Sequence, residues 1–168
     1  MQVYRIIKDD HKQTPFSTIG AERYPGRWNP AGVGILYTST SPELALLEKM
    51  VHLDIVPYTR LPRLWLMCVD LPNPDTAGNP PLIRYLSPSD LPPDWNHPVS
   101  TNAQTFLQEW FDNPDTLGIG VPSVVMNISY NILLHPKHPL FGTLTISQGL
   151  EYTLDSRLWR RVGQESGE

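Results

Sequence analysis

Arg27 lies in the segment 25–30, Pro-Gly-Arg-Trp-Asn-Pro, whose composition suits the binding of an anion. Gly26 allows another group to approach the backbone closely, while Trp28 and Pro30 stiffen the turn. A guanidinium presented by such a turn can form two parallel hydrogen bonds to a phosphate. A solvated loop arginine is the simpler interpretation of the same residues, and the pattern alone does not separate the two.

Glu48 is the second residue whose surroundings suit chemistry. A helix is predicted from Pro42 to about His52, because Ser41 is a good N-cap and proline suits the first helical position. On the helical wheel Glu48 is about 40° from Leu44, so it borders the apolar face. A carboxylate there is partly desolvated, which is costly unless it is paired. Glu48 is either a boundary residue that reaches solvent or pairs with His52, or a catalytic carboxylate aimed into a cleft.

Tyr37 and Ser123 are two further candidates on predicted strands. Tyr37 lies in the segment 34–39, which leads into the helix that carries Glu48, and its ring could belong to the core or support a flat ligand. Ser123 follows Pro122 in the predicted strand 120–126 and on pattern alone is a small polar residue in a sheet. Neither residue indicates a reaction by itself.

Other reactive constellations are weak. His135 and His138 could suggest a metal pair, but no Cys or Asp is nearby and Pro136 breaks the local helix. A hydrolase triad through Ser123 lacks the Gly-x-Ser-x-Gly elbow. Because no Rossmann or P-loop glycine pattern is present, side chains must hold the phosphates of any nucleotide that binds. Cys68, in an apolar run, is expected to be buried and inert.

The charge and hydropathy of the chain limit its partners. The 168 residues include 13 Lys and Arg against 17 Asp and Glu, a formal net charge of −4. Since no basic run is present, nucleic acid is not expected as a direct partner, although a local positive pocket could take a small phosphate ligand. No signal peptide is visible, and no apolar stretch approaches the ~20 residues of a membrane helix. A cytoplasmic protein without membrane contact is expected.

The predicted elements favour a single α+β domain. Thr101 and Gln104 form a capping box that opens a helix through Phe111, and a short helix is expected near 87–91. The proline in the strand 120–126 is expected at an edge or a bulge. Because strands and helices do not alternate regularly, mixed or antiparallel sheets with a few helices are favoured over a doubly wound parallel sheet. The predicted strands are 3–7, 34–39, 64–71, 120–126, 144–146 and 151–154.

The order of these segments resembles the RES-domain family. The blocks that carry the resemblance are 26–32 (Gly-Arg-Trp-Asn-Pro-x-Gly), 35–39 (Ile-Leu-Tyr-Thr-Ser), 45–48 (Ala-x-x-Glu), 121–125 (Val-Pro-Ser-Val-Val) and 131–139. The arginine, glutamate and serine that name the family fall on Arg27, Glu48 and Ser123. One departure is His135, where many members carry asparagine. The resemblance implies a RES domain over 1–162 and leaves a polar tail over 163–168.

Several properties follow as implications of the resemblance alone. It implies a fold like that of the ADP-ribosyltransferases and a toxin of a bacterial toxin–antitoxin pair that depletes NAD+. NAD+ would be a substrate, with inorganic phosphate as a co-substrate if the reaction is phosphorolysis, and no prosthetic group is implied. A helix-turn-helix antitoxin of the Xre type would cover the site, and the toxin would form a homodimer.

The resemblance also implies roles for the candidate residues. Cleavage of the nicotinamide–ribose bond passes through an oxocarbenium-like state, which the Glu48 carboxylate would stabilise. Arg27 would grip the pyrophosphate, Tyr37 would contact the nicotinamide, Ser123 would fix Glu48 or a ribose hydroxyl, and Arg5 would give a second phosphate contact. Phosphorolysis, hydrolysis and transfer of ADP-ribose to a protein would share these residues. A non-catalytic interaction module of the same fold is a further alternative, while the acidic pI disfavours a ribonuclease.

Overall fold

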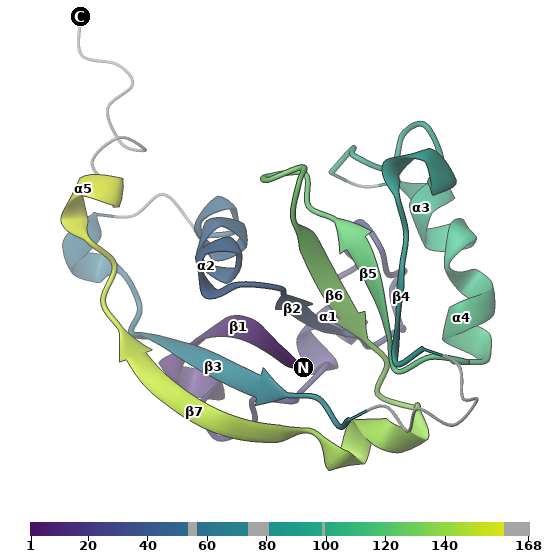
Figure 1. Cartoon of the computed structure of the whole chain (residues 1–168). Helices are drawn as coiled ribbons and strands as arrows, with labels where there is room; N and C mark the ends of the chain where they lie inside the picture. Colours follow the sequence, from purple (N-terminus) through teal and green to yellow (C-terminus); the bar gives the residue numbers. More distant parts are fainter. Residues whose placement is uncertain (54–56, 74–80, 99, 160–168) are drawn as a thin grey trace, which may run out of the picture.

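The computed structural model describes residues 1–53, 57–73, 81–98 and 100–159. They form one seven-stranded sheet in the order β4-β5-β6-β2-β1-β3-β7 (Figure 1). Neighbouring strands are antiparallel except for β4 with β5, so the sheet is mixed and the predicted α+β class is confirmed. The strands are β1 (Gln2–Lys8), β2 (Leu36–Ser39), β3 (Leu64–Asp70), β4 (Ile83–Tyr85), β5 (Gly118–Pro122), β6 (Tyr130–Leu134) and β7 (Thr145–Tyr152).

The helices of the described chain are short. None of them has the length and apolar composition that a bilayer span requires. The α-helices are α1 (Ile19–Arg23), α2 (Pro42–Val51), α3 (Thr101–Phe106), α4 (Gln108–Asp112) and α5 (Ser156–Trp159). Four 3-10 turns complete the elements: η1 (Asp9–His11), η2 (Tyr58–Arg60), η3 (Pro88–Asp90) and η4 (Pro139–Thr143).

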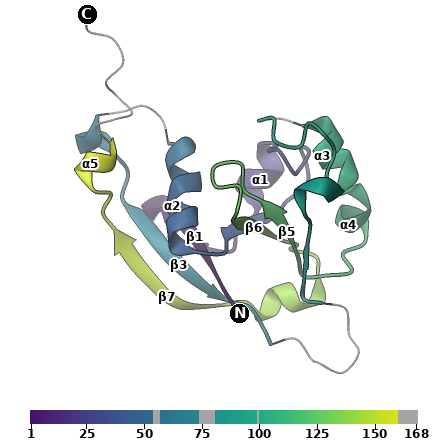
Figure 2. The same ribbon diagram turned by 45° about the horizontal axis from the view of Figure 1, so that its top comes forward.

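Helices cover one face of the sheet in two separate groups. α2 packs beside β1, where Ala45 joins a buried cluster with Ile6 and Leu64. α3 and α4 pack over β5 and β6, where Trp110 and Ile119 belong to a second cluster. Figures 1 and 2 show α2 over one half of the sheet and α3 with α4 over the other. The helix-covered face between these groups is therefore where parts distant in sequence can meet.

Cross-strand pairing places three polar side chains on this helix-covered face. Tyr37 pairs with Leu133, which belongs to the buried cluster under α3 and α4. Ser39 pairs with Asn131, two residues along each strand from that first pair. Because side chains alternate between faces with a period of two, Tyr37, Ser39 and Asn131 share a face.

The predicted helix that carries Glu48 is confirmed as α2. The Ser41 hydroxyl caps it by accepting a hydrogen bond of 3.2 Å from the Leu44 N–H, and Pro42 opens its first turn. The helix ends one residue earlier than predicted, since His52 is its C-cap.

The predicted start of the next long helix is wrong. Ser100, one residue before Thr101, is the N-cap of α3, and its hydroxyl accepts a hydrogen bond of 2.9 Å from the Ala103 N–H. Leu107 then interrupts the helix, so α3 and α4 replace one continuous element. The short helix expected near 87–91 is present as η3.

The predicted strand 120–126 is wrong beyond Pro122, where β5 ends. The Ser123 hydroxyl accepts hydrogen bonds from the N–H groups of Val125 (3.1 Å) and Met126 (3.0 Å), which gives these amides a local partner in place of a strand ladder. Pro122 is also not on an edge strand, because β5 lies between β4 and β6. The last residue of β5 that pairs with β4 is Gly120, so no strand on that side needs the missing proline N–H.

Two further strand predictions need correction. Most of the predicted segments 144–146 and 151–154 belongs to one continuous strand, β7, which begins at Thr145, ends at Tyr152 and pairs with β3. Gly149 lies in its middle and does not end it. β6 was not predicted as a strand, yet it is central, since it pairs with both β2 and β5.

Candidate active site

Glu48 lies on the side of α2 that faces the sheet, and sheet residues bind its carboxylate. Its Oε1 accepts a hydrogen bond of 2.7 Å from the Ser123 hydroxyl and one of 2.5 Å from Nδ2 of Asn131. The side chain is half-buried, and the two donors offset the desolvation that its boundary position predicts. The ion pairs within the described residues do not include one between Glu48 and His52.

Ser123 connects Glu48 to the loop between β5 and β6. Its side chain is fully buried. The hydroxyl donates its single proton to Glu48 while its oxygen accepts the N–H groups of Val125 and Met126. The two amides therefore fix the position of the oxygen, and the hydroxyl proton points at the carboxylate.

Asn131 is a partner of Glu48 to which sequence reasoning assigned no role. Its Oδ1 accepts a hydrogen bond of 2.8 Å from the hydroxyl of Ser39, its cross-strand neighbour on β2. Its Nδ2 is thereby left to donate to Glu48. A polar residue at the start of an otherwise apolar strand, opposite a serine, is the signal that could have identified it.

Arg27 lies close enough to Glu48 for their charges to interact. Burial lowers the pKa of its guanidinium, and the negative charge of Glu48 acts in the opposite direction. Its Nε donates a hydrogen bond of 2.8 Å to the carbonyl of His97. Among the described residues, no acceptor is bound to its two Nη groups. The outer fork of the guanidinium is therefore available to an anionic ligand.

The turn that carries Arg27 is held from three directions. Trp28 is buried and stacks on Trp95, with ring centroids 6.0 Å apart. The side-chain amide of Gln104 on α3 donates a hydrogen bond of 2.7 Å to the carbonyl of Gly26. The fully buried Asn29 donates from its Nδ2 to backbone carbonyls on both sides of the turn. The turn is stiff, as its composition predicts.

Tyr37 reaches this turn from β2. Its hydroxyl donates a hydrogen bond of 2.7 Å to Oδ1 of Asn29. Burial raises the pKa of this phenol, while a hydrogen bond with the Trp28 backbone and the charge of Arg27 act in the opposite direction. The Tyr37 hydroxyl is therefore occupied within the protein, close enough to Arg27 to respond to its charge.

Arg5 is not brought together with these residues. Its β1 neighbour Tyr4 pairs with Ser39 on the helix-covered face, so by alternation Arg5 lies on the opposite side of the strand. Its Nη1 donates a hydrogen bond of 3.1 Å to the carbonyl of Pro15, and burial lowers its pKa to about 10. Burial lowers the pKa of Lys49 on α2, and the charges of Lys8 and Arg5 act in the same direction.

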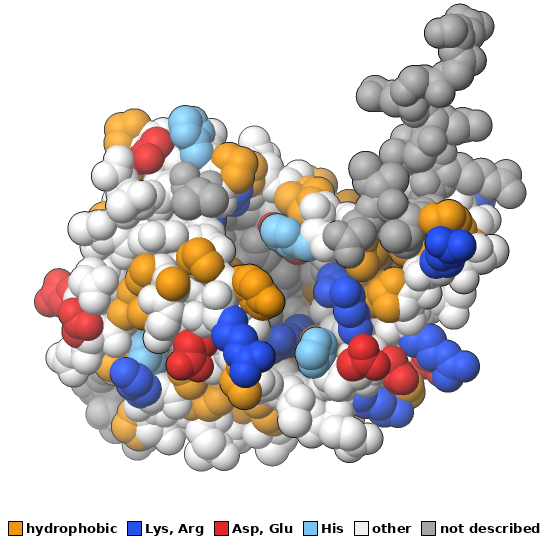
Figure 3. Space-filling view, turned by 180° about the vertical axis from the view of Figure 1, so that it is seen from behind, with side chains coloured by type: hydrophobic (Ala, Val, Ile, Leu, Met, Phe, Trp, Pro, Cys, Tyr) orange, Lys and Arg blue, Asp and Glu red, His pale blue; other side chains and the backbone are white. Residues whose placement is uncertain are grey.

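The acidic chain nevertheless has several cations on one face. Figure 3 shows Lys and Arg side chains near the middle of this face, with Asp and Glu side chains beside some of them. The described residues hold only two Arg–carboxylate ion pairs, Arg84 with Asp115 and Arg157 with Asp155. Several cations are therefore not neutralised by contact with a carboxylate, which suits an anionic ligand.

The sites that the sequence disfavoured stay without support in the described residues. No group of three or more His, Cys, Asp or Glu side chains there could hold a metal ion. His135 is instead buried against the ring of Trp110, with ring centroids 4.9 Å apart. Cys68 is buried, and burial raises the pKa of its thiol.

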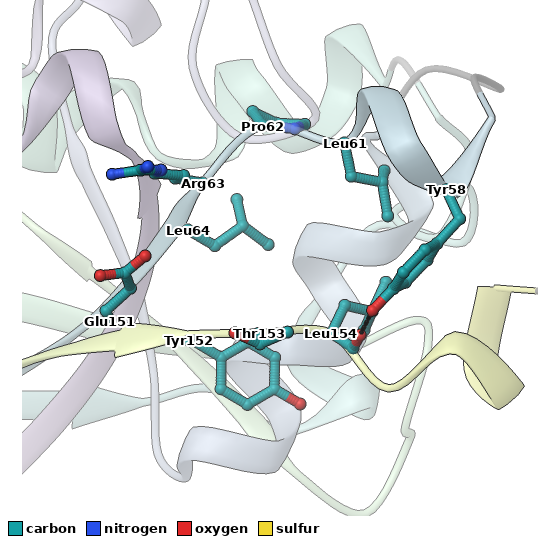
Figure 4. Close-up of a pocket in the computed structure, with 9 residues that line it drawn as sticks. All are labelled: Tyr58, Leu61, Pro62, Arg63, Leu64, Glu151, Tyr152, Thr153 and Leu154. Atoms are coloured by element: carbon teal, nitrogen blue, oxygen red, sulfur yellow. Dashed lines mark hydrogen bonds between the residues drawn. The ribbon is translucent and has the colours of Figure 1, made fainter.

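A half-open pocket lies elsewhere, and neither Glu48 nor Arg27 lines it. It measures about 170 Å³ and lies between η2 and the end of β7, where Tyr58, Leu64, Tyr152 and Leu154 line it (Figure 4). The Tyr58 hydroxyl donates to the carbonyl of Leu154 at 2.6 Å. This pocket contains none of the candidate residues.

Comparison with known proteins shows the family to which the chain belongs. The model of the family described as "RES domain" matches residues 2–155. This range is nearly the whole chain and includes Arg27, Tyr37, Glu48 and Ser123. The chain belongs to the RES-domain family.

Relatives of this RES-domain chain are full-length matches. It is 31% identical over 160 residues to Toxin Res of Yersinia enterocolitica, which covers 94% of this chain and 99% of that protein. It is 32% identical over 163 residues to Toxin Res of Photorhabdus laumondii, covering 94% and 97%. It is 29% identical over 164 residues to the Prs ADP-ribosylating toxin of a Sphingobium species, covering 95% and 97%. Three relatives of matching length are thus toxins, and one of them is an ADP-ribosylating enzyme.

Proposed function

We propose that this RES-domain chain is an enzymatic toxin that consumes NAD+ by cleaving the bond between nicotinamide and ribose. The observation that carries the proposal is the position of the Glu48 carboxylate. Ser123 and Asn131 bind one of its oxygens, and its charge interacts with that of Arg27. The toxin names of its relatives support the biological role. No prosthetic group is required for this reaction.

The residue types fit the charge changes of the reaction. As the glycosidic bond breaks, its electron pair goes to the nicotinamide nitrogen, which leaves neutral and needs no general acid. The ribose carbon becomes cation-like, and a nearby carboxylate stabilises this state. Glu48 supplies that charge, while the free Nη groups of Arg27 bind the pyrophosphate. Tyr37 lines the nicotinamide end through its ring, whereas Arg5, on the opposite side of β1, is not part of this site.

The acceptor for ADP-ribose distinguishes two versions of the proposal. Phosphate or water attacking the ribose carbon gives ADP-ribose 1″-phosphate or free ADP-ribose. A nucleophilic side chain of a target protein gives an ADP-ribosylated protein instead, and the name of the Sphingobium relative favours this second candidate. Both use the same carboxylate and the same arginine. We further propose a cytoplasmic homodimer that is held inactive by a helix-turn-helix antitoxin covering the site, without direct nucleic-acid binding.

A product assay tests the proposal. Purified protein is incubated with NAD+ labelled in its ADP-ribose part, with and without phosphate and with and without a bacterial extract. Glu48→Gln and Arg27→Ala should each abolish most of the nicotinamide release. Glu43→Gln on the exposed side of the same helix and Arg84→Ala in an exposed ion pair are matched controls and should stay active. Unaltered turnover in both site variants would exclude this assignment.

A further inference from the structure

We infer that Asn131 is a positioning residue that, together with Ser39, fixes which oxygen of Glu48 faces the substrate. The inference rests on the proposed cleavage of NAD+ at Glu48. Its structural basis is a chain of two hydrogen bonds, from the Ser39 hydroxyl to Asn131 Oδ1 (2.8 Å) and from Asn131 Nδ2 to Glu48 Oε1 (2.5 Å). Of the three side chains joined by these hydrogen bonds, only the carboxylate of Glu48 has to touch the substrate.

Ser39 sets the orientation of the Asn131 side chain. A hydroxyl has one proton to donate, and that of Ser39 goes to Oδ1 of Asn131. The amide nitrogen must then point the other way, toward Glu48. If the amide were turned by half a rotation, its oxygen would face the carboxylate oxygen and repel it. Ser39 is itself buried, so bulk water does not compete for this bond.

The two donors converge on a single oxygen of Glu48. Ser123 and Asn131 both bind Oε1, while among the described residues no donor is bound to Oε2. A carboxylate held in this way keeps its rotation fixed and presents Oε2 with its lone pairs unused. Oε2 is therefore the oxygen that lies toward the ribose carbon or its hydroxyls.

The positioning group is rigid because it is built into the sheet. Ser39 and Asn131 are in-register partners on β2 and β6, and Ser123 directly follows β5, which pairs with β6. Glu48 thus takes its orientation from three neighbouring strands and not from its own helix alone. A catalytic carboxylate that is misplaced by about 1 Å can lose around a hundredfold in rate.

Steady-state kinetics of nicotinamide release test the inference. Asn131→Ala should lower kcat roughly tenfold to a hundredfold with little change in the KM for NAD+, because an interaction that orients the reacting group is lost while substrate contacts remain. Ser39→Ala should lower kcat less, since the amide keeps its donor but loses the bond that fixes its orientation. Asn113→Ala, an exposed asparagine without a side-chain hydrogen bond, is the control and should match the wild type.

A charge variant separates positioning from a merely structural role. Asn131→Asp places a second carboxylate against Glu48, so activity should fall at neutral pH and recover partly as the pH is lowered and one of the pair is protonated. A purely structural role predicts no such change in pH profile. An active wild type with an unaffected Asn131→Ala overturns this inference and leaves the proposed function intact. A wild type that releases no nicotinamide with any acceptor overturns both.

Discussion

The hydroxyl of Tyr37 donates a hydrogen bond of 2.7 Å to Oδ1 of Asn29 and so ties β2 to the turn that carries Arg27. Asn29 is fully buried, and its Nδ2 donates hydrogen bonds to the carbonyls of Ala21 and Val33. One tyrosine hydroxyl thereby joins the strand that precedes the Glu48 helix to the loop that presents the arginine. This hydrogen bond therefore links the segment that leads to Glu48 with the turn that carries Arg27.

Tyr37→Phe tests this connection directly. The change removes one hydrogen bond and leaves a buried amide oxygen without its donor, which should lower the free energy of unfolding by about 1–3 kcal/mol. The KM for NAD+ should rise because the Arg27 turn is held less firmly. Urea denaturation and steady-state kinetics measure the two effects. Tyr24→Phe is the control, since Tyr24 is 77% exposed, and equal stability of both variants would contradict the connection.

Gly26→Ala disturbs the same contact from the other side. A Cβ at Gly26 would lie 2.9 Å from the Tyr37 hydroxyl oxygen and 3.0 Å from Oδ1 of Asn29. One of the two must move, so we expect a loss of about 1–3 kcal/mol in stability together with a higher KM.

Gly20→Ala is the matched control for this substitution. A Cβ at Gly20 meets nothing within 4 Å, and the residue lies in α1. Alanine there should be neutral or stabilise the protein by up to about 1 kcal/mol. If Gly26→Ala behaved like Gly20→Ala in thermal denaturation, the close packing at the turn would have no energetic importance.

Ser123→Ala should affect stability and activity together. The variant loses the donor to Glu48 and the acceptor for two loop amides. We expect a stability loss of about 1–3 kcal/mol and a fall in kcat of at least tenfold. Ser123→Thr retains the hydroxyl and should recover more activity than alanine if the extra methyl group is accommodated. An alanine variant with normal kcat would show that Asn131 alone orients Glu48.

His135 should make stability depend on pH. Its Nδ1 accepts a hydrogen bond of 3.1 Å from the N–H of Lys137, and its Nε2 lies 3.2 Å from the carbonyl of Phe111. The ring is therefore neutral when folded, and burial lowers its pKa. The unfolded chain binds the proton first as the pH falls, so the stabilisation is complete above about pH 6.5 and is lost below it.

Denaturant unfolding at pH 7.5 and pH 5.5 measures this effect. A single group can contribute at most about 1.4 kcal/mol per pH unit. His138, whose pKa is also lowered by burial, adds a contribution of the same sign. His135→Asn should flatten the pH dependence because it removes one titrating group. A variant with the slope of the wild type would show that His135 is not responsible.

The sequence indicated the parts of the site that local rules determine. Ser41 and Pro42 define where α2 begins, and the helical period then places Glu48 at the border of its apolar face. These features of α2 depend on neighbours within one or two turns of chain, so they can be predicted without knowledge of the sheet. The Arg27 turn differs, because Trp95 and Gln104, which hold it in the structure, are distant in sequence.

The parts that could not be predicted depend on contacts distant in sequence. Asn131 is informative only once β6 is known to lie beside β2, because only then does it face Ser39 and Glu48. Ser123 ends a strand by binding the next amides through its side chain, which strand propensity does not reveal. Arg5 looked suitable as a cation near the start of the chain, but the alternation of β1 turns it away from the helix-covered face.

Glu48 finds its hydrogen-bond donors 75 and 83 residues further along the chain. While the protein is being made on a ribosome, α2 can form early, but its carboxylate has nothing to orient it until β5 and β6 have emerged and paired. A nascent chain that stops before Gly118 contains both Arg27 and Glu48 and still lacks the assembled centre. Synthesis itself therefore delays the moment at which the proposed cleavage of NAD+ can begin.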